Sequence, residues 1–304
     1  MSHLFQVFVD NIVPIILVAG AGFALQRLFK IDPRPLSVTV FNVLTPALVF
    51  HLLVESSMPT NGAFRLALLA TLVVLSLVIL SWILGRALHF DTRTLAALIL
   101  SASFLNAGNY GLSLNQIALG SVGLAWASIY YITNSLWTNS LGVIIAQAGR
   151  MPAINAVKGL ARVPAVYAVL LAFGMRWFQL ELPAFVMEPV GLLSNATVPV
   201  MLLVLGMQIG KAGIPSRWNI LALVSVLQLI VAPLLAWGLS LVLRLPSPVA
   251  EVAVIEAATP TAVLAMIIAL EFNVEPELVT SSVVLTTLLS PLTITPILVL
   301  LRIG

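Results

Sequence analysis

Apolar residues follow one another along the chain in runs of about 20, and short polar or charged clusters separate the runs. As a helix, a run of this length crosses a hydrocarbon core of about 30 Å. Hydropathy windows predict ten membrane-spanning helices. These lie near residues 8–28, 37–54, 65–85, 94–119, 121–147, 159–178, 189–209, 219–243, 249–270 and 279–301. The sequence therefore predicts an all-α, polytopic membrane protein.

Composition supports this class. Of the 304 residues, 61% are hydrophobic and 8% charged, whereas a soluble domain carries about 25% charge. The ten spans leave no room for a soluble domain, so the extramembrane enzyme classes are excluded. There is no cysteine, which excludes disulfides, thiolate metal sites and a cysteine nucleophile. The pI of about 9.6 reflects topology signals, and we expect no nucleic-acid partner.

The basic residues indicate an orientation. If the N-terminus faces outside, ten of the 14 Lys and Arg residues fall in inward loops and four fall outside. The inward set is Arg27, Lys30, Arg34, Arg86, Arg93, Arg150, Lys158, Arg162, Lys211 and Arg217. Cytoplasmic loops collect Lys and Arg, so both termini are predicted outside.

A weak internal repeat runs through the chain. An offset of 153 superimposes Asn42 on Asn195, Pro46 on Pro199, Ser128 on Ser281 and Thr133 on Thr286, and an offset of 150 superimposes Val13-Pro14 on Val163-Pro164. Five matches in chain order favour a duplicated five-span unit, residues 1–149 and 150–304. An odd number of spans makes the second copy inverted, as in many secondary transporters. The alternative is coincidence among the Pro, Ser and Thr residues of membrane helices.

Two spans carry helix-breaking residues at their centres. The fourth holds Asn106, Gly108, Asn109 and Gly111 within S-F-L-N-A-G-N-Y-G. The ninth holds Glu256, Thr259, Pro260 and Thr261 within E-A-A-T-P-T. The 153 offset places Asn106 on Thr259, so the breaks are repeat partners. Such breaks persist where they line a cavity or are buried in protein, and simple kinking or close packing is the alternative.

Each break creates a half-helix N-terminus with free N–H groups and partial positive charge. Two such ends, meeting from opposite sides, would bind an anion without a basic side chain. The predicted substrate-binding residues are Asn106, Gly108, Asn109, Asn134, Thr259, Pro260 and Thr261. In span five, Tyr130, Asn134 and Thr138 share one helix face, which either lines a cavity or joins helices.

Glu256 is the one acidic residue predicted near the membrane centre, and no basic residue lies at its depth. It must be protonated, bind a cation or face water. Pro260 removes the helical partner of the Glu256 carbonyl. We expect this carbonyl, the Glu256 carboxylate and the hydroxyls of Ser128 and Thr133 to form a coupling-ion site for Na⁺ or H⁺. A solvated bystander is the alternative.

Other motifs in the sequence give weaker evidence about function. The G-L-S-L stretch at 111–114 resembles a serine-protease motif, but His3, His51 and His89 lie near span ends and cannot act as its base. We therefore expect no enzyme, and no cofactor other than the coupling ion. Gly206 and Gly210 form a G-x-x-x-G that is compatible with dimerisation. No ATP-binding motif occurs.

The stretches FLNAGNYGLSL, EAATPTAVLAMIIALEFN and ELVTSSVVLTTLLSPLTITPIL resemble the bacterial auxin efflux carrier family, relatives of the plant PIN-FORMED auxin exporters. The resemblance covers the whole chain. It implies a fold similar to bile acid sodium symporters and Na⁺/H⁺ antiporters. In that fold spans 1, 2, 6 and 7 form a scaffold, the other spans form a moving domain, and helices 4 and 9 cross at their breaks. It also implies organic-anion substrates such as indole-3-acetate, malate or malonate, a homodimer and the bacterial inner membrane.

Three departures from that family stand out. The segment 149–158 is too short for the long cytoplasmic loop of the plant proteins, and Ala107 stands where many of them have a crossover proline. The plant carriers are thought to lack a coupling ion, whereas Glu256 stands where sodium symporters place a cation ligand. The leading hypothesis is a secondary carrier for small carboxylates. The alternatives are an anion channel, an ion-coupled symporter of the bile acid type and a carboxylate-binding membrane sensor.

Overall fold

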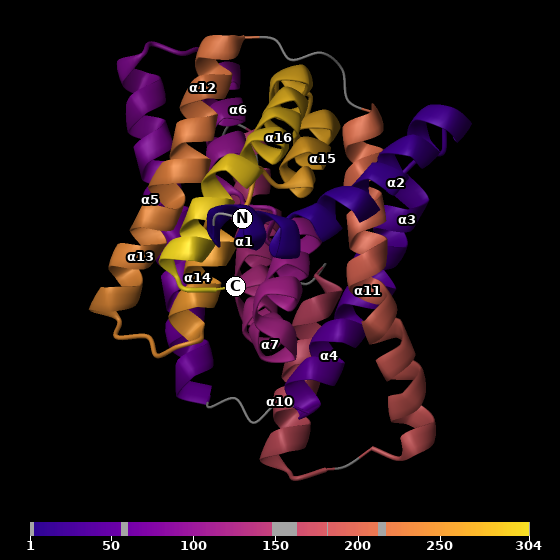
Figure 1. Ribbon diagram of the computed structural model, residues 1–304. Coiled ribbons are helices and arrows are strands. Elements are labelled where there is room, and N and C mark those ends of the chain that lie inside the picture. Colours follow the sequence, from indigo (N-terminus) through magenta and orange to yellow (C-terminus); the bar gives the residue numbers. More distant parts are fainter. Residues whose placement is uncertain (1–2, 56–59, 148–162, 181, 212–216, 304) are drawn as a thin grey trace.

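The computed structural model describes residues 3–55, 60–147, 163–180, 182–211 and 217–303, which form helices and one isolated β-bridge (Figure 1). The first half contains α1 (His3–Asn11), α2 (Val13–Phe29), α3 (Arg34–Thr39), η1 (Val40–Leu44), α4 (Thr45–Glu55), α5 (Thr60–Ala87), α6 (Thr92–Ser103), η2 (Ala107–Leu112), α7 (Ser113–Trp137), η3 (Thr138–Gly142) and α8 (Val143–Ala146). The second half contains α10 (Pro164–Trp177), α11 (Ala184–Lys211), α12 (Trp218–Val226), η4 (Leu227–Val231), α13 (Ala232–Val242), α14 (Val249–Ala257), α15 (Val263–Glu271) and α16 (Pro276–Leu300).

Within these described ranges, six helical stretches are long and apolar enough to cross a membrane, or seven if α1 and α2 count as one bent span. The remaining apolar helices are shorter. Helix α10 has 14 residues, α6 has 12, and α14 and α15 have nine each. The short lengths of α6, α14 and α15 follow from the two interruptions, which fall where the sequence predicts them.

Two predicted spans are less regular than expected. Helices α1 and α2 meet at an angle of 42° because Pro14, in the first turn of α2, has no N–H with which to continue the ladder. The span at 34–55 contains the π-helical turn η1. Helix α7 breaks at Gly120, whose φ of 66° favours glycine. Gly120 lies between the predicted ends of spans four and five.

The helices gather into two groups. Helices α2, α3, α4, α10 and α11 occupy one side of the molecule, and α5, α6 and α12 to α16 lie on the other (Figure 1). The largest contact joins α2 to α11. At Gly206 an added Cβ would overlap the Ala19 carbonyl, and at Gly210 it would meet the Gln26 side chain. The G-x-x-x-G of α11 is thus filled by α2 of the same chain, which corrects its interpretation as a dimerisation motif.

The ends of α2, α5 and α11 and the starts of α3, α6 and α12 lie at the upper end in Figure 1. Several basic residues that the sequence predicts to face inward therefore share one end. Arg150, Lys158 and Arg162 lie outside the described residues. Lys211 pairs with Asp32 there, with 2.8 Å between Nζ and Oδ1.

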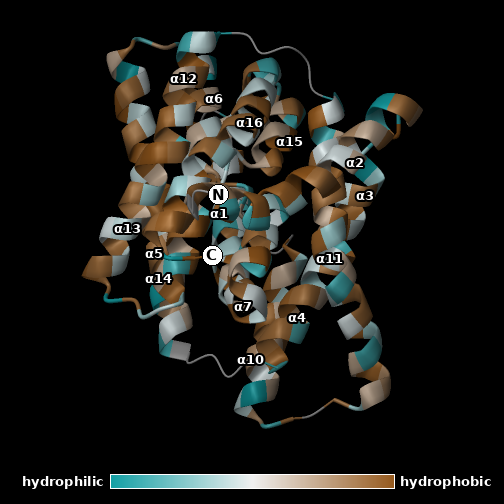
Figure 2. Ribbon diagram, in the orientation of Figure 1, coloured by the Kyte–Doolittle hydropathy of each residue, from teal (hydrophilic) through white to brown (hydrophobic). Residues whose placement is uncertain are grey.

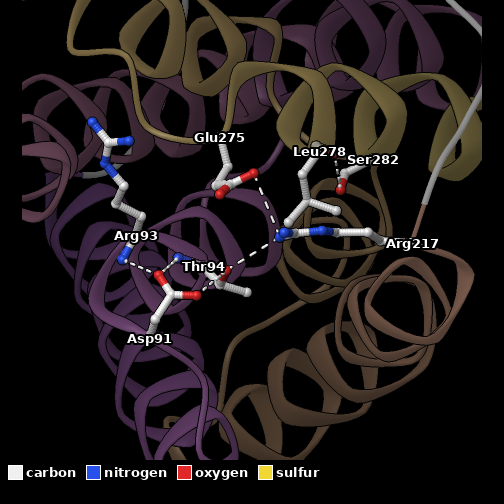
Figure 3. A network of polar contacts seen from close by, with 7 residues as sticks. All are labelled: Asp91, Arg93, Thr94, Arg217, Glu275, Leu278 and Ser282. Carbon is white, nitrogen blue, oxygen red and sulfur yellow. Dashed lines mark hydrogen bonds and ion pairs between the residues drawn. The ribbon is translucent and has the colours of Figure 1, made fainter.

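A second polar network at this end joins three helix starts (Figure 3). Arg217 Nη1 donates to Thr94 Oγ1 at 3.2 Å and lies 3.4 Å from Glu275 Oε2. Asp91 caps α6 by accepting from the N–H groups of Arg93 and Thr94 at 2.9 and 3.1 Å. The hydroxyl of Thr94, 2.7 Å from Asp91 Oδ2, is the main reason that the pKa of Asp91 lies below its ordinary value.

The surface is apolar and the interior contains polar groups. Figure 2 shows brown, hydrophobic ribbon over much of the exterior, with teal concentrated at helix ends. Trp177, Val242 and Leu300 are 84%, 77% and 80% exposed, while Gln228, Asn115 and Glu256 are fully buried. The apolar surface is explained by contact with the hydrocarbon core of a membrane. Buried polar groups in such a protein mark functional regions.

Candidate functional site

The two helix interruptions meet in space. Leu105 and Thr261 form an antiparallel bridge, flanked by two backbone hydrogen bonds. The N–H of Asn106 donates to the Pro260 carbonyl and the N–H of Ala262 to the Phe104 carbonyl, both at 2.8 Å. Each broken segment therefore supplies the backbone partners that the other lost when its helix ended. We call this contact the crossover, residues 104–106 and 258–262.

Buried side chains complete the crossover. Gln228, from η4, donates from Nε2 to the Phe104 carbonyl at 3.2 Å and accepts at Oε1 from the Thr261 hydroxyl at 2.7 Å. Asn134 donates to the Leu105 carbonyl at 2.8 Å. The Thr286 hydroxyl, from α16, accepts the N–H of Thr261 at 3.0 Å. Gln228 was not among the residues expected from the sequence, although an amide within an apolar span is a detectable signal.

A cavity of about 980 Å³ reaches the crossover from one side. Four predicted substrate-binding residues line it, namely Asn106, Gly108, Asn109 and Asn134. The starts of both resumed helices also line it, through residues 106, 108 and 109 and residues 262–264. The starts of η2 and of α15 have no side-chain cap, so N–H groups at both helix starts are available to a ligand.

Asn106 provides a buried side-chain donor that has no partner in the cavity wall. Its Nδ2 is buried and has no partner, and the residue is 5% exposed. Its carbonyl, in contrast, accepts the N–H groups of Gly111 and Tyr110 at 3.0 and 3.3 Å. Buried donors are normally paired, so an unpaired one at a cavity wall is available to water or to a ligand. Gly108 is required because a Cβ there would meet the Tyr131 ring at 2.8 Å.

The other three predicted substrate-binding residues are elsewhere. Thr259, Pro260 and Thr261 are buried and do not line the cavity. The hydroxyl and N–H of Thr261 are bonded within the crossover. Thr259 donates its hydroxyl to the Glu256 carbonyl at 2.7 Å. The expectation of a free Glu256 carbonyl is therefore wrong, because the side chain one turn later replaces the N–H that Pro260 lacks.

Glu256 lies in a different polar cluster. Its Oε1 accepts from Asn115 Nδ2 at 3.0 Å, and a Cβ at Gly111 would overlap its carboxyl group. The hydroxyls of Ser128 and Thr133 donate to the carbonyls of Leu124 and Ile129 in their own helix, each at 2.9 Å. The structure thus does not assemble Glu256, Ser128 and Thr133 into one oxygen site.

The three residues expected to coordinate sodium do not form a set of oxygen ligands around one position. A hard cation requires several oxygen ligands, whereas Oε1 of Glu256 accepts from an amide N–H and the hydroxyls of Ser128 and Thr133 are bonded within their own helix, away from Glu256. No group of three or more His, Asp or Glu side chains that could hold a metal ion occurs within the described ranges.

Charged residues surround the cavity mouth. Arg34, Lys211, Asp32 and Glu271 line it and are exposed. The hydrogen bond from Lys211 is the main cause that places the pKa of the Asp32 carboxyl below its ordinary value, so this carboxyl group is ionised at neutral pH. The basic side chains stay at the mouth, and polar, uncharged groups line the inner end.

Comparison with known proteins identifies the chain as a membrane transport protein. The family model described as membrane transport protein matches residues 7–298. An uncharacterized transporter of Methanothermobacter thermautotrophicus is 26% identical over 294 residues, which cover 94% of this chain and 96% of the relative. An uncharacterized transporter of Methanocaldococcus jannaschii is 25% identical over 298 residues, with the same two coverages. The chain therefore belongs to the membrane transport protein family, the auxin efflux carrier family that its crossover motifs resemble.

Proposed function

We propose that the protein is a secondary carrier that moves small organic anions by elevator-type alternating access. The substrate class is carboxylates such as indole-3-acetate, malate or malonate. The observation that carries this proposal is the unpaired Nδ2 of Asn106, which lies at the inner end of the cavity between two uncapped helix starts.

The donors at this position are strong enough for a transported anion. A helix N-terminus contributes about 0.3 to 2 kcal/mol toward a negative charge. A hydrogen bond to a charged group adds about 1.5 to 3 kcal/mol. Two helix starts with one amide donor together supply about 2 to 7 kcal/mol. This corresponds to a Kd between about 10 μM and about 30 mM, from which a carrier can release its cargo.

The proposal includes ten spans in two inverted repeats, residues 1–149 and 150–304. Two observations support it. The Thr197 hydroxyl donates to the Leu44 carbonyl at 3.0 Å, and these residues are separated by 153 positions, the offset of the sequence repeat. The crossover is an antiparallel bridge, which has a local two-fold axis, as inverted repeats require.

The division into helix groups supports a scaffold of spans 1, 2, 6 and 7, formed by α1 to α4, α10 and α11. The remaining spans form the moving domain. The proposal also includes a homodimer in a bacterial inner membrane, with both termini outside and the cavity open to the inside. The end that collects basic loops is the end where Arg34 and Lys211 line the cavity mouth, which supports that orientation.

The test is uptake into proteoliposomes across a panel of labelled carboxylates, followed by counterflow against unlabelled substrate. We expect saturable uptake of at least one carboxylate and acceleration by substrate on the opposite side. Non-saturating flux without counterflow would identify an anion channel. Saturable binding without flux would identify a membrane sensor.

A further inference from the structure

The carboxyl group of Glu256 lies across the crossover from the cavity. None of the described residues 110–130 or 249–261 lines the cavity, whereas Glu256 is fully buried against Gly111 and Asn115. The two places are linked through one short stretch of helix. The carbonyl of Asn106, at the cavity, accepts the N–H of Gly111 at 3.0 Å, and the α-carbon of Gly111 abuts the carboxyl group.

The orientation of the Asn115 amide is fixed by its neighbours. Its Nδ2 lies 2.9 Å from the Gly111 carbonyl and 3.0 Å from Glu256 Oε1. Both neighbours are acceptors, so the flipped amide would set an oxygen against two oxygens. The Asn115 group that faces the carboxyl is therefore the N–H donor Nδ2. A cation at this position would need an oxygen ligand there instead.

No basic group among the described residues pairs with Glu256. Helix α5 carries Arg65 and Arg86 near its ends, and α13 carries no titratable group. The phenol of Tyr130, on α7, is fully buried and its hydroxyl has no hydrogen-bond partner. The phenol of Tyr110, on η2, is bonded to Ser290 of α16 at 3.0 Å, and the acid of α16, Glu277, lies in its first turn.

Three buried polar atoms of this cluster have no partner, namely Glu256 Oε2, Asn115 Oδ1 and Tyr130 OH. A bare carboxylate with one amide donor is expensive inside a membrane protein. A proton on Oε2 removes the charge and adds a donor to a cluster with free acceptors. A proton therefore neutralises the carboxylate in place, without a basic partner.

We propose that Glu256 is the binding site of a proton that is transported together with the anion, and that sodium has no role at this site. The inference rests on the proposed function. The step is protonation of the carboxylate by a proton from water on one side, with an O–H bond formed, and its release to the other side. Symport follows because a bare carboxylate beside a bound anion would place two negative charges in the moving domain.

The experiment uses the full chain in proteoliposomes, with the labelled carboxylate that shows counterflow as the probe. Proton and sodium gradients are imposed separately. We expect an inward proton gradient to accelerate wild-type uptake and a sodium gradient to have no effect. Glu256→Gln should lose the acceleration and retain counterflow. The matched control Glu251→Gln, at the start of the same helix, should respond as the wild type does.

The inference is overturned if the acceleration persists in Glu256→Gln. It is also overturned if wild-type uptake responds to the sodium gradient or to neither gradient. In each of these cases, counterflow would still support the carrier function. If no carboxylate gives counterflow, the carrier function fails. An infrared measurement on the purified protein then decides the site separately. We expect the C=O stretch of a protonated carboxylic acid at neutral pH, absent in Glu256→Gln. Its absence from the wild type overturns the inference even if the variant does not fold.

Discussion

The side chains of Gln228 and Thr261 are joined by a 2.7 Å hydrogen bond, although one residue lies on η4 and the other in the break before α15. Through Nε2, Gln228 also holds the Phe104 carbonyl of the other break. A single buried amide from a third helix thus binds both interrupted segments. The crossover depends on a residue outside the two motifs that identify it in the sequence.

Replacement of Gln228 by Leu should therefore disturb both breaks together. We expect it to lower the free energy of unfolding by about 1 to 3 kcal/mol, because the Phe104 carbonyl and Thr261 hydroxyl each lose a buried partner. Carboxylate affinity should fall as well. Thermal unfolding in detergent and saturation binding measure the two effects. The control is Gln6→Leu on the exposed face of α1, and equal effects from both variants would contradict the assigned role.

Asn106→Ala should weaken carboxylate binding by about 1 to 3 kcal/mol, because it removes an unpaired donor that is directed at a charged ligand. Stability should change little, since Nδ2 has no protein partner to lose. Asn42→Ala is the matched control. Asn42 lines the same cavity, but its amide donates to the Val38 carbonyl of its own helix at 2.9 Å. Wild-type saturation binding in Asn106→Ala would show that the anion binds elsewhere.

Asp91→Ala should lower the free energy of unfolding by about 0.5 to 2 kcal/mol at neutral pH, through loss of the α6 cap. The pKa of Asp91 is lowered in the folded protein, so its contribution is present at neutral pH and is lost as pH falls through that lowered pKa. The difference between wild type and variant should therefore shrink in acid. Asp91→Asn keeps a capping oxygen without titration, and a pH-dependent difference between Asn and Ala would contradict this explanation. Unfolding curves over a pH series measure it.

Gly206→Ala should cost about 1 to 3 kcal/mol of stability, because the new methyl group overlaps the Ala19 backbone in a packed contact. Gly238→Ala, with no atom within 4 Å of the added Cβ, should instead stabilise the protein by about 0.5 to 1 kcal/mol. Since α2 of the same chain covers the surface at Gly206, the oligomeric state of Gly206→Ala in native mass spectrometry should equal that of the wild type. A loss of dimer without loss of stability would restore the intermolecular interpretation.

Orientation can be measured directly because the chain has no cysteine. Single cysteines at His89 and Gln179, both exposed, lie in loops predicted on opposite faces. An impermeant thiol reagent should label Gln179→Cys in intact cells, and His89→Cys only after the membrane is opened. The reverse pattern would invert the proposed topology.

The amino-acid pattern alone predicts the class of protein, the runs of apolar helix and the positions of both interruptions. These features depend on local composition, because membrane insertion reads the hydropathy of about 20 residues at a time and Pro and Gly act on their own turn. The family motifs and the cluster Asn106, Gly108 and Asn109 were recognisable for the same reason. The division of the chain at Gly120 was also implied by where the apolar runs end.

Which polar groups are free depends on how the helices pack together. Asn115 meets Glu256 across 141 residues and Gln228 meets Phe104 across 124, and no local pattern specifies such pairs. The Thr259 hydroxyl donates to the Glu256 carbonyl, which the sequence predicts to be free. Helix α2 covers the glycine surface of α11 that the sequence makes compatible with dimerisation. A buried polar atom is satisfied by whichever partner the packing brings within about 3 Å. Which donors remain for a ligand is therefore a property of the assembled helices, and here Asn106 is one of them.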